Sequence, residues 1–149
     1  MKKFATMIIA CVIVLAFTGC SSRQKTTKCV YSNTTMIVNE VTFEHDSKGK
    51  ITKYVVSYEY DVSNLGEEED YYIVRLEKYR LLLEKKEGFS YEYEISNFII
   101  KEEMTMDPSK GSTEDGIWLG LLPKGSPEEL TKDEIVSIFK NQGITCLDQ

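Results

Sequence analysis

Residues 37–60, IVNEVTFEHDSKGKITKYVVSYEY, decide the fold of this 149-residue chain. On both sides of the turn-forming run at 46–50, apolar side chains alternate with polar ones. The apolar positions are Ile37, Val41 and Phe43 before the run, and Tyr54, Val56, Tyr58 and Tyr60 after it. A period of two is that of an antiparallel strand with one buried face, so the stretch predicts a β-hairpin. Gly49 supplies the positive φ that the turn requires.

The segment after this hairpin predicts a helix that ends before Gly88. Its apolar residues recur at spacings of four, three and four and form one stripe, made of Tyr72, Leu76, Tyr79 and Leu83. Four acidic residues at 67–70 begin the helix, and Lys85 and Lys86 end it, as the helix dipole favours. We interpret the acidic run as a solvated first turn and not as a metal site, because consecutive helical carboxylates point in different directions.

Residues 91–106 predict a second hairpin with a tight connection at Ser96-Asn97. Its alternating apolar positions are Tyr91, Tyr93 and Ile95, then Phe98, Ile100, Met104 and Met106. Residues 107–116, DPSKGSTEDG, replace every apolar position with turn formers and charges, so they predict a loop. This loop departs from the EF-hand ligand pattern, and we assign it no metal.

Residues 117–123, IWLGLLP, are the most apolar stretch outside the N-terminus. We expect Trp118 to fill the core, because a lone tryptophan in a small domain is usually buried. A contact between Trp118 and a membrane or a partner is the alternative.

The C-terminal part predicts one more helix and one more strand. Thr131 and Glu134 have the capping-box spacing, which indicates a helix from Lys132 to Asn141. The buried side of this helix is expected to carry Ile135, Ile138 and Phe139. Residues 144–147 then supply a short strand. The fold class is therefore α+β: an antiparallel sheet of two hairpins plus a short C-terminal strand, packed by two helices in the order β-β-α-β-β-α-β, within a single domain at residues 29–149.

Residues 1–19 have the features of a secretion signal. Lys2 and Lys3 precede eleven apolar residues at 7–17, a run too short to span a bilayer. Residues 17–20, FTGC, resemble a lipobox with phenylalanine where leucine is usual, so we expect Cys20 to be diacylated when the signal is removed. Residues 20–28 are then expected to be the lipidated cysteine and a flexible polar tether.

The composition limits the partners. Without residues 1–19, the chain falls from 149 to 130 residues and from 18 to 16 basic side chains, against 24 acidic ones, which leaves a net charge of −8. This surface repels nucleic acid, so no nucleic-acid partner is expected. The expected partner is the membrane, reached through a diacylglyceryl cysteine on its extracytoplasmic face. An envelope protein or a small ligand is a further candidate.

Two cysteines remain when Cys11 leaves with the signal and Cys20 takes the lipid. Outside the cytoplasm two leftover thiols normally pair, so we predict a disulfide between Cys29 and Cys146. Their spacing and the single histidine argue against a metal or redox pair. The bridge would place the first and last strands side by side.

The inventory of catalytic groups is poor, and we expect no enzyme, no cofactor and no metal. His45 is predicted at the rim of the first hairpin, without a nucleophile to serve. Glu102 and Glu103 are adjacent on a strand and face opposite ways, which prevents them from acting as a pair of catalytic carboxylates.

The nine tyrosines leave two readings open. Tyr54, Tyr58 and Tyr60 share one strand face, and Tyr91 and Tyr93 could continue it on a neighbouring strand. With Trp118, these rings would form a binding platform if they faced solvent. We favour the other reading, in which the tyrosines pack under the helix that carries Tyr72 and Leu83.

The lipobox, the KCVY run at 28–31, the QGITC run at 142–146 and this order of elements together resemble the YehR-like family of uncharacterised bacterial envelope lipoproteins. The resemblance implies an α+β domain at the cell envelope and transfers no site residue. We therefore expect a lipid-anchored, non-enzymatic protein that binds a partner or supports an assembly near the membrane. A lipoprotein that binds a small apolar or peptidic molecule is the alternative, and an enzyme is a distant third.

Overall fold

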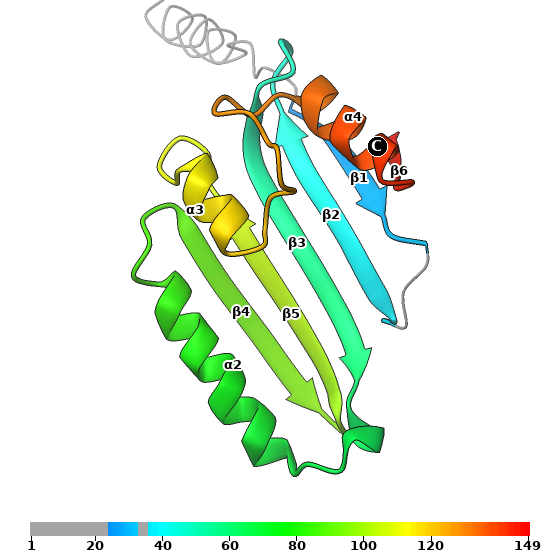
Figure 1. The fold of residues 1–149 in the computed structure, drawn as a ribbon, viewed down its shortest axis with the longest axis vertical. Helices are drawn as coiled ribbons and strands as arrows, with labels where there is room; N and C mark the ends of the chain where they lie inside the picture. The colour runs from blue at the N-terminus through cyan, green and yellow to red at the C-terminus, as the bar shows by residue number, and fades with distance from the viewer. Residues whose placement is uncertain (1–23, 33–35) are drawn as a thin grey trace, which may run out of the picture.

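The computed structural model describes residues 24–32 and 36–149, and its main feature is a six-stranded antiparallel sheet (Figure 1). The strands are β1 (Lys25–Val30), β2 (Val38–His45), β3 (Ile51–Asp61), β4 (Phe89–Ser96), β5 (Ile99–Met106) and β6 (Thr145–Asp148). Their order across the sheet is β4-β5-β3-β2-β1-β6. Both predicted hairpins, the C-terminal strand and the α+β class are confirmed. The predicted signal and Cys20 lie outside the described residues.

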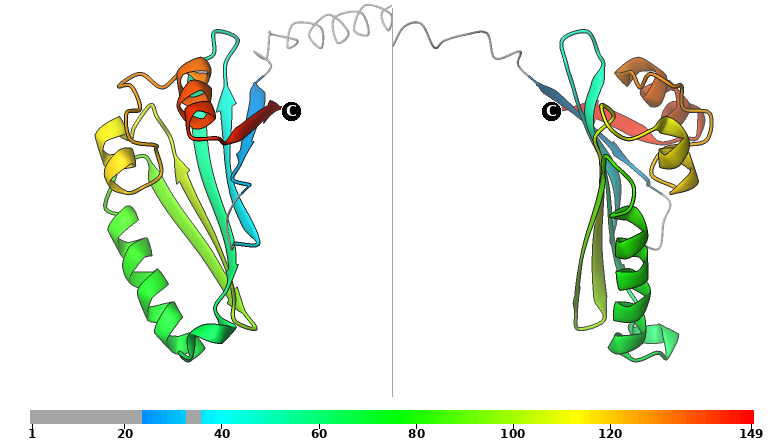
Figure 2. Two further views of the ribbon diagram at one scale, coloured as in Figure 1. Left: turned by 45° about the vertical axis from the view of Figure 1, so that its right-hand side comes forward. Right: turned by 90° about the vertical axis from the view of Figure 1, so that its left-hand side faces the viewer.

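The helices cover one face of this sheet (Figure 2). They are α2 (Glu69–Leu83), α3 (Thr113–Trp118) and α4 (Lys132–Asn141), and a short 3₁₀ turn, η2 (Ser63–Leu65), precedes α2. α2 packs on β4, and α4 packs on β1 and β6. None of the helices in the described ranges is long and apolar enough to cross a bilayer.

The core lies between the sheet and the helices. The predicted stripe on α2 is correct, since Tyr72, Leu76 and Leu83 are buried and Tyr79 is partly buried against them. On α4, Ile135 and Phe139 are buried and Ile138 is partly buried, also as predicted. The other face of the sheet is open and carries charged side chains, among them Lys28, Glu40, Glu59, Lys101 and Glu103.

β1 corrects the predicted tether at residues 20–28, because Lys25–Val30 is a strand of the sheet, between β2 and the edge strand β6. β1 pairs with β2 on one side and with β6 on the other, so its backbone groups are held on both edges. The Thr27 side chain is buried, and its hydroxyl donates a hydrogen bond to Asp148 Oδ1 at 2.7 Å. Backbone pairing and one buried hydroxyl thus order a segment that has too few apolar residues to predict a strand.

The predicted disulfide is present, with Cys29 and Cys146 directly opposite each other on β1 and β6. It joins residues 117 positions apart and places the first and last strands side by side, as expected. His45 is not at the rim as predicted. Its side chain is only 3% exposed, and its Nε2 lies 3.3 Å from Thr27 Oγ1 on the neighbouring strand.

α3 lies partly within the predicted loop at 107–116. The Ser112 side chain accepts a hydrogen bond from the Asp115 N–H, and this cap begins the helix. Gly116 faces the core so closely that a Cβ there would lie 2.7 Å from Leu122. Trp118 follows two residues later, about 200° further around the helix. Trp118 therefore points outward and is 65% exposed, so the prediction that it fills the core is wrong.

Candidate functional site

The tyrosines of the predicted binding face lie on the covered face of the sheet, but they divide into two groups. Tyr54 and Tyr91 are buried core residues, and Tyr54 stacks on Phe43 with ring centroids 6.0 Å apart. Tyr58, Tyr60 and Tyr93 are only partly buried. Core packing, the favoured reading, therefore holds for two of the five, and three rings retain access to solvent.

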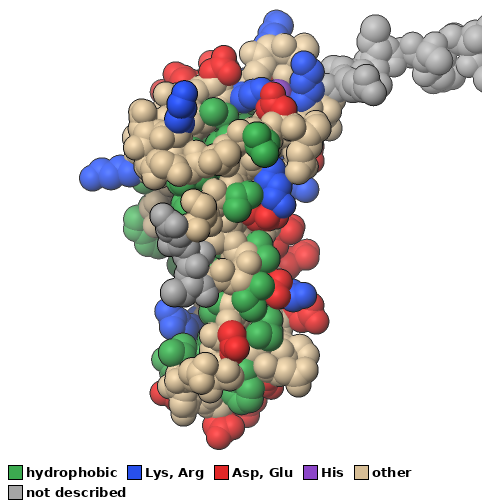
Figure 3. Space-filling model, turned by 90° about the vertical axis from the view of Figure 1, so that its right-hand side faces the viewer, with side chains coloured by type: hydrophobic (Ala, Val, Ile, Leu, Met, Phe, Trp, Pro, Cys, Tyr) green, Lys and Arg blue, Asp and Glu red, His purple; other side chains and the backbone are tan. Residues whose placement is uncertain are grey.

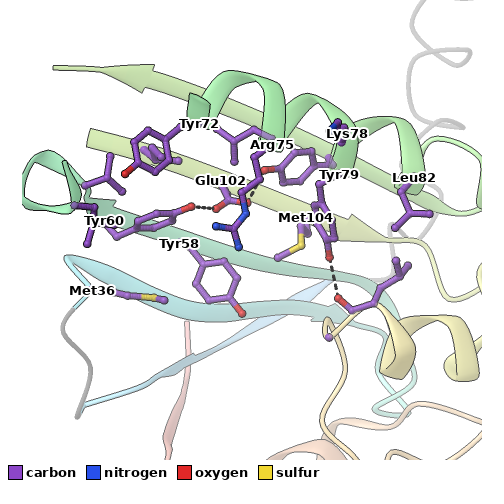
Figure 4. Close-up of a pocket in the computed structure, with 17 residues that line it drawn as sticks. Met36, Tyr58, Tyr60, Tyr72, Arg75, Lys78, Tyr79, Leu82, Glu102 and Met104 are labelled. Atoms are coloured by element: carbon purple, nitrogen blue, oxygen red, sulfur yellow. Dashed lines mark hydrogen bonds between the residues drawn. The ribbon is translucent and has the colours of Figure 1, made fainter. Parts of the chain in front are cut away.

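A cavity of about 760 Å³ lies between α2 and the sheet, and two of these three rings, those of Tyr58 and Tyr60, line it (Figure 4). Its floor comes from β3, β5 and β4 and includes Tyr58, Tyr60, Tyr91, Ile100, Glu102 and Met104. Tyr72, Arg75, Tyr79 and Leu82 on α2 form one wall, and Leu119 closes one end. We call this cavity the groove. Trp118 does not line the groove, so the predicted tyrosine and tryptophan set is not one surface.

Glu102 is at the centre of the tyrosines on the floor. Register pairing places Glu102 directly opposite Tyr58 on β3 and Tyr93 on β4. Its carboxylate accepts hydrogen bonds from two diagonal neighbours, the Tyr60 hydroxyl and, at 2.5 Å, the Tyr91 hydroxyl (Figure 4). One carboxylate thus joins three strands on the covered face.

The pKa values of these hydroxyls follow from the arrangement. Burial raises the pKa of Tyr60 and of Tyr91, and the hydrogen bond to the Glu102 carboxylate raises both further. Burial and the negative charge of Glu102 also raise the pKa of Tyr58 and Tyr79. All four hydroxyls are therefore protonated at neutral pH, and those of Tyr60 and Tyr91 serve as donors to the carboxylate.

The wall on α2 is fixed by contacts to its surroundings. The Tyr79 hydroxyl donates to the Leu119 carbonyl at 2.9 Å, and the Tyr79 ring meets Tyr91 edge-on at 5.1 Å. On the far side of the helix, Tyr93 donates to Glu77 at 3.2 Å, and Glu77 pairs with Arg80. These contacts hold the wall at a fixed distance from the floor.

Two cationic side chains of α2, Arg75 and Lys78, line the groove, and Tyr72 on the same helix has a buried hydroxyl. Arg75 reaches toward Glu102 and Tyr58, and Lys78 stands beside it on the helix (Figure 4). None of the ion pairs formed by the described residues includes Arg75, Lys78 or Glu102. Tyr72 is 5% exposed, and its hydroxyl is one of two buried side-chain groups in the described ranges with no hydrogen-bond partner.

The surface outside the groove has two further features. Figure 3 shows acidic side chains gathered along one side of the molecule, with hydrophobic side chains exposed beside them. On the side of the molecule that Figure 3 does not face, the exposed apolar residues include Tyr71, Val74 and Leu81 on α2 and Trp118 on α3. No group of three His, Cys, Asp or Glu residues in the described part of the chain could hold a metal ion.

Sequence reasoning identified the tyrosines but missed Glu102, Arg75 and Tyr72 as residues of the groove. Glu102 and Glu103 do face opposite ways, as expected. The available signal was the position of Glu102 between Ile100 and Met104, which are both buried on the same face. A carboxylate at an inward position of a strand requires partners, and here they are tyrosine hydroxyls.

The fold is similar to two solved structures, whereas no protein-family model and no curated protein matches the chain. The NMR structure of the Escherichia coli YehR protein superimposes with a TM-score of 0.71 at 13% identity, covering 86% of this chain and 94% of that one. The NMR structure of a protein from Streptococcus pneumoniae TIGR4 gives a TM-score of 0.63 at 14% identity, covering 87% of each chain. The chain therefore has a YehR-like fold.

Proposed function

We propose that this chain is a lipid-anchored protein of the bacterial cell envelope that acts without catalysis, by binding a small apolar or peptidic ligand in the groove. The groove carries this proposal. Its volume of about 760 Å³ lies within the range of small-molecule sites, about 300–1,000 Å³, and its lining is largely aromatic and aliphatic with a few polar groups. That combination gives a ligand apolar contact and a fixed orientation.

Two further observations favour binding over catalysis. Cys29 and Cys146 are joined as a disulfide, so neither supplies a thiolate. The Thr27 hydroxyl beside His45 is buried and donates to Asp148, which leaves it without access to a substrate. The lipid anchor is supported by the signal features of residues 1–19 and by FTGC at 17–20.

A second candidate function, support of an envelope assembly, is favoured by the exposed apolar residues on α2 and α3. Tyr71, Val74, Leu81 and Trp118 are all about half exposed or more. Large exposed apolar groups often mark protein contacts. None of these four residues lines the groove, so a contact through them would not compete with a ligand in the groove.

The test of ligand binding uses the full chain in lipid nanodiscs with ¹³C-methyl-labelled methionines. Met104 lines the groove, whereas Met106 is buried and does not, so the two methyl signals separate groove binding from general effects. Titration with 2-phenylethanol, an uncharged aromatic probe, is expected to shift Met104 saturably. The Leu82→Trp variant fills the groove and should abolish the shift, whereas Leu81→Trp, on the outer side of α2, should preserve it. A Met104 signal that responds to no probe, or equally in both variants, would refute binding in the groove.

The anchor is tested by the intact mass of protein isolated from the native membrane. We expect a chain that begins at Cys20 and carries acyl mass, and that gains about two daltons when the disulfide is reduced. An unacylated chain would contradict the envelope anchor and leave the groove experiment unaffected.

A further inference from the structure

The polar groups of the groove indicate its ligand class. Building on the proposed function, we infer that the groove binds an organic cation, an ammonium or guanidinium group on an apolar body, with the cation at Glu102 and the body against the tyrosine rings. Two observations carry this inference: the Glu102 carboxylate can accept further hydrogen bonds and forms none of the ion pairs among the described residues, and tyrosine rings line the groove around it.

Glu102 has capacity to accept more hydrogen bonds. An ionised carboxylate offers about four lone-pair positions, and the hydroxyls of Tyr60 and Tyr91 use one on each oxygen. Both partners are neutral, so they satisfy hydrogen bonding without neutralising the charge. In a partly enclosed site, a carboxylate without a cationic partner attracts one more strongly than it would in bulk water.

The surroundings of Glu102 suit a cation that brings apolar surface with it. The rings of Tyr58, Tyr60, Tyr79 and Tyr91 all line the groove. Aromatic faces carry partial negative charge and attract ammonium and guanidinium groups, and several such rings around one point form an aromatic cage. The Glu102 carboxylate, which lines the same groove as these rings, adds a full negative charge to this attraction.

The guanidinium group of Arg75 lies in the groove near Glu102. Its side chain extends from α2 toward Glu102 and Tyr58, without closing an ion pair (Figure 4). A ligand cation must share this space with the guanidinium group, so Arg75 should oppose its binding. An anionic amphiphile would instead place its charge at Arg75 and Lys78, and the two ligand classes predict opposite effects of the same substitutions.

The experiment compares three phenylethyl probes that differ in charge: phenethylamine, 2-phenylethanol and 3-phenylpropionate. The full chain in nanodiscs is titrated with each probe, and the Met104 methyl signal gives the dissociation constant. We expect the amine to bind tightest. Glu102→Gln should weaken amine binding about tenfold or more, since a buried charged hydrogen bond is lost, and Arg75→Gln should strengthen it several-fold. Neither substitution should change 2-phenylethanol binding by more than about twofold.

Matched controls lie on or next to the same elements. Glu103→Gln removes the same charge from the next residue of β5, on the open face. Lys85→Gln removes a cation two residues beyond the end of α2, outside the groove. Both should leave amine binding unchanged. Glutamine at 102 can accept from one tyrosine hydroxyl through its oxygen and donate to the oxygen of the other through its NH2 group. An unchanged Met106 signal verifies that the variant is folded.

Each other outcome overturns the inference in a defined way. If the three probes bind equally, or if the propionate binds best and Arg75→Gln weakens it, the groove binds ligands but not cations, and only this inference fails. If none of the probes shifts Met104, both this inference and the proposed function fail.

Discussion

Removal of the disulfide should destabilise the domain more than any single core substitution. Cys29→Ala with Cys146→Ala opens a covalent loop of 117 residues between two strands of the same sheet. In the chain-entropy model, closing a loop of that length lowers the entropy of the unfolded chain by about 16 cal/mol/K, which is about 5 kcal/mol at 25 °C. That is comparable with the whole free energy of unfolding of a marginal small domain.

Urea unfolding measures this effect directly. With a slope of about 2 kcal/mol per M for a domain of this size, the urea midpoint should fall by about 2.5 M. Reduced wild-type protein is the control, because it lacks the bond and keeps both sulfur atoms in the core. We expect reduced protein to lose most of the effect already, with a smaller further loss in the double alanine variant, since Cys29 is fully buried.

The reasoning would be refuted if reduction moved the midpoint by less than about 0.5 M, which corresponds to about 1 kcal/mol. That result would mean that the polar strand β1 and the short strand β6 are held by backbone pairing and α4 alone. It would also mean that the two ends of the unfolded chain already lie close together without the bond.

Two further experiments test the exposure of Trp118 and the hydrogen bonds that Tyr60 and Tyr91 donate to Glu102. Trp118→Ala should lower the free energy of unfolding by less than about 0.5 kcal/mol, because the side chain is exposed. Leu122→Ala, at a buried position four residues later, should lower it by about 2–5 kcal/mol. If thermal unfolding shows equal losses for the two variants, Trp118 is a core residue. The folded domain raises the pKa of Tyr60 and of Tyr91 above the usual tyrosine value of 10.0. The two protonated hydroxyls therefore contribute fully to the free energy of unfolding below pH 10, and this contribution is lost as the pH rises above 10. Urea midpoints from pH 8 to 11 should fall above pH 10, and Tyr60→Phe with Tyr91→Phe should flatten the fall.

Periodicity predicted most of the architecture because most of the sheet is built from alternating apolar residues. Tyr54 and Val56 on β3, and Met104 and Met106 on β5, are buried where a period of two places them. β1 could not be found in this way. Its order comes from backbone pairing with two neighbours that are distant in sequence, and residues 25–28 contain no apolar side chain to reveal it.

The candidate site was less predictable than the fold, because its lining depends on which inward-facing residues of the sheet the helix α2 leaves uncovered. Tyr91 and Tyr58 have the same residue type and the same inward orientation. Tyr91 lies beneath Tyr79 of α2 and is buried, whereas Tyr58 is two strands further from the helix and stays accessible. The position of a helix across a sheet determines this difference, and no local pattern in the strand encodes it.

The two-residue turn between β4 and β5 sets the register of β5, and this register places Glu102 in the groove. Asn97 and Phe98, which connect β4 to β5, both have positive φ, and this is costly for the phenylalanine. The turn is held by its surroundings: the Phe98 N–H donates to Glu69 Oε1 at 2.8 Å, and the Phe98 carbonyl accepts from the Val62 N–H at 2.9 Å. A slip of one residue in β5 would turn Glu102 to the open face and Glu103 inward, away from the hydroxyl of Tyr60. Because Glu69 begins α2, the same contact fixes both the carboxylate on the floor and the helix that forms the wall, so the two sides of the groove are positioned together.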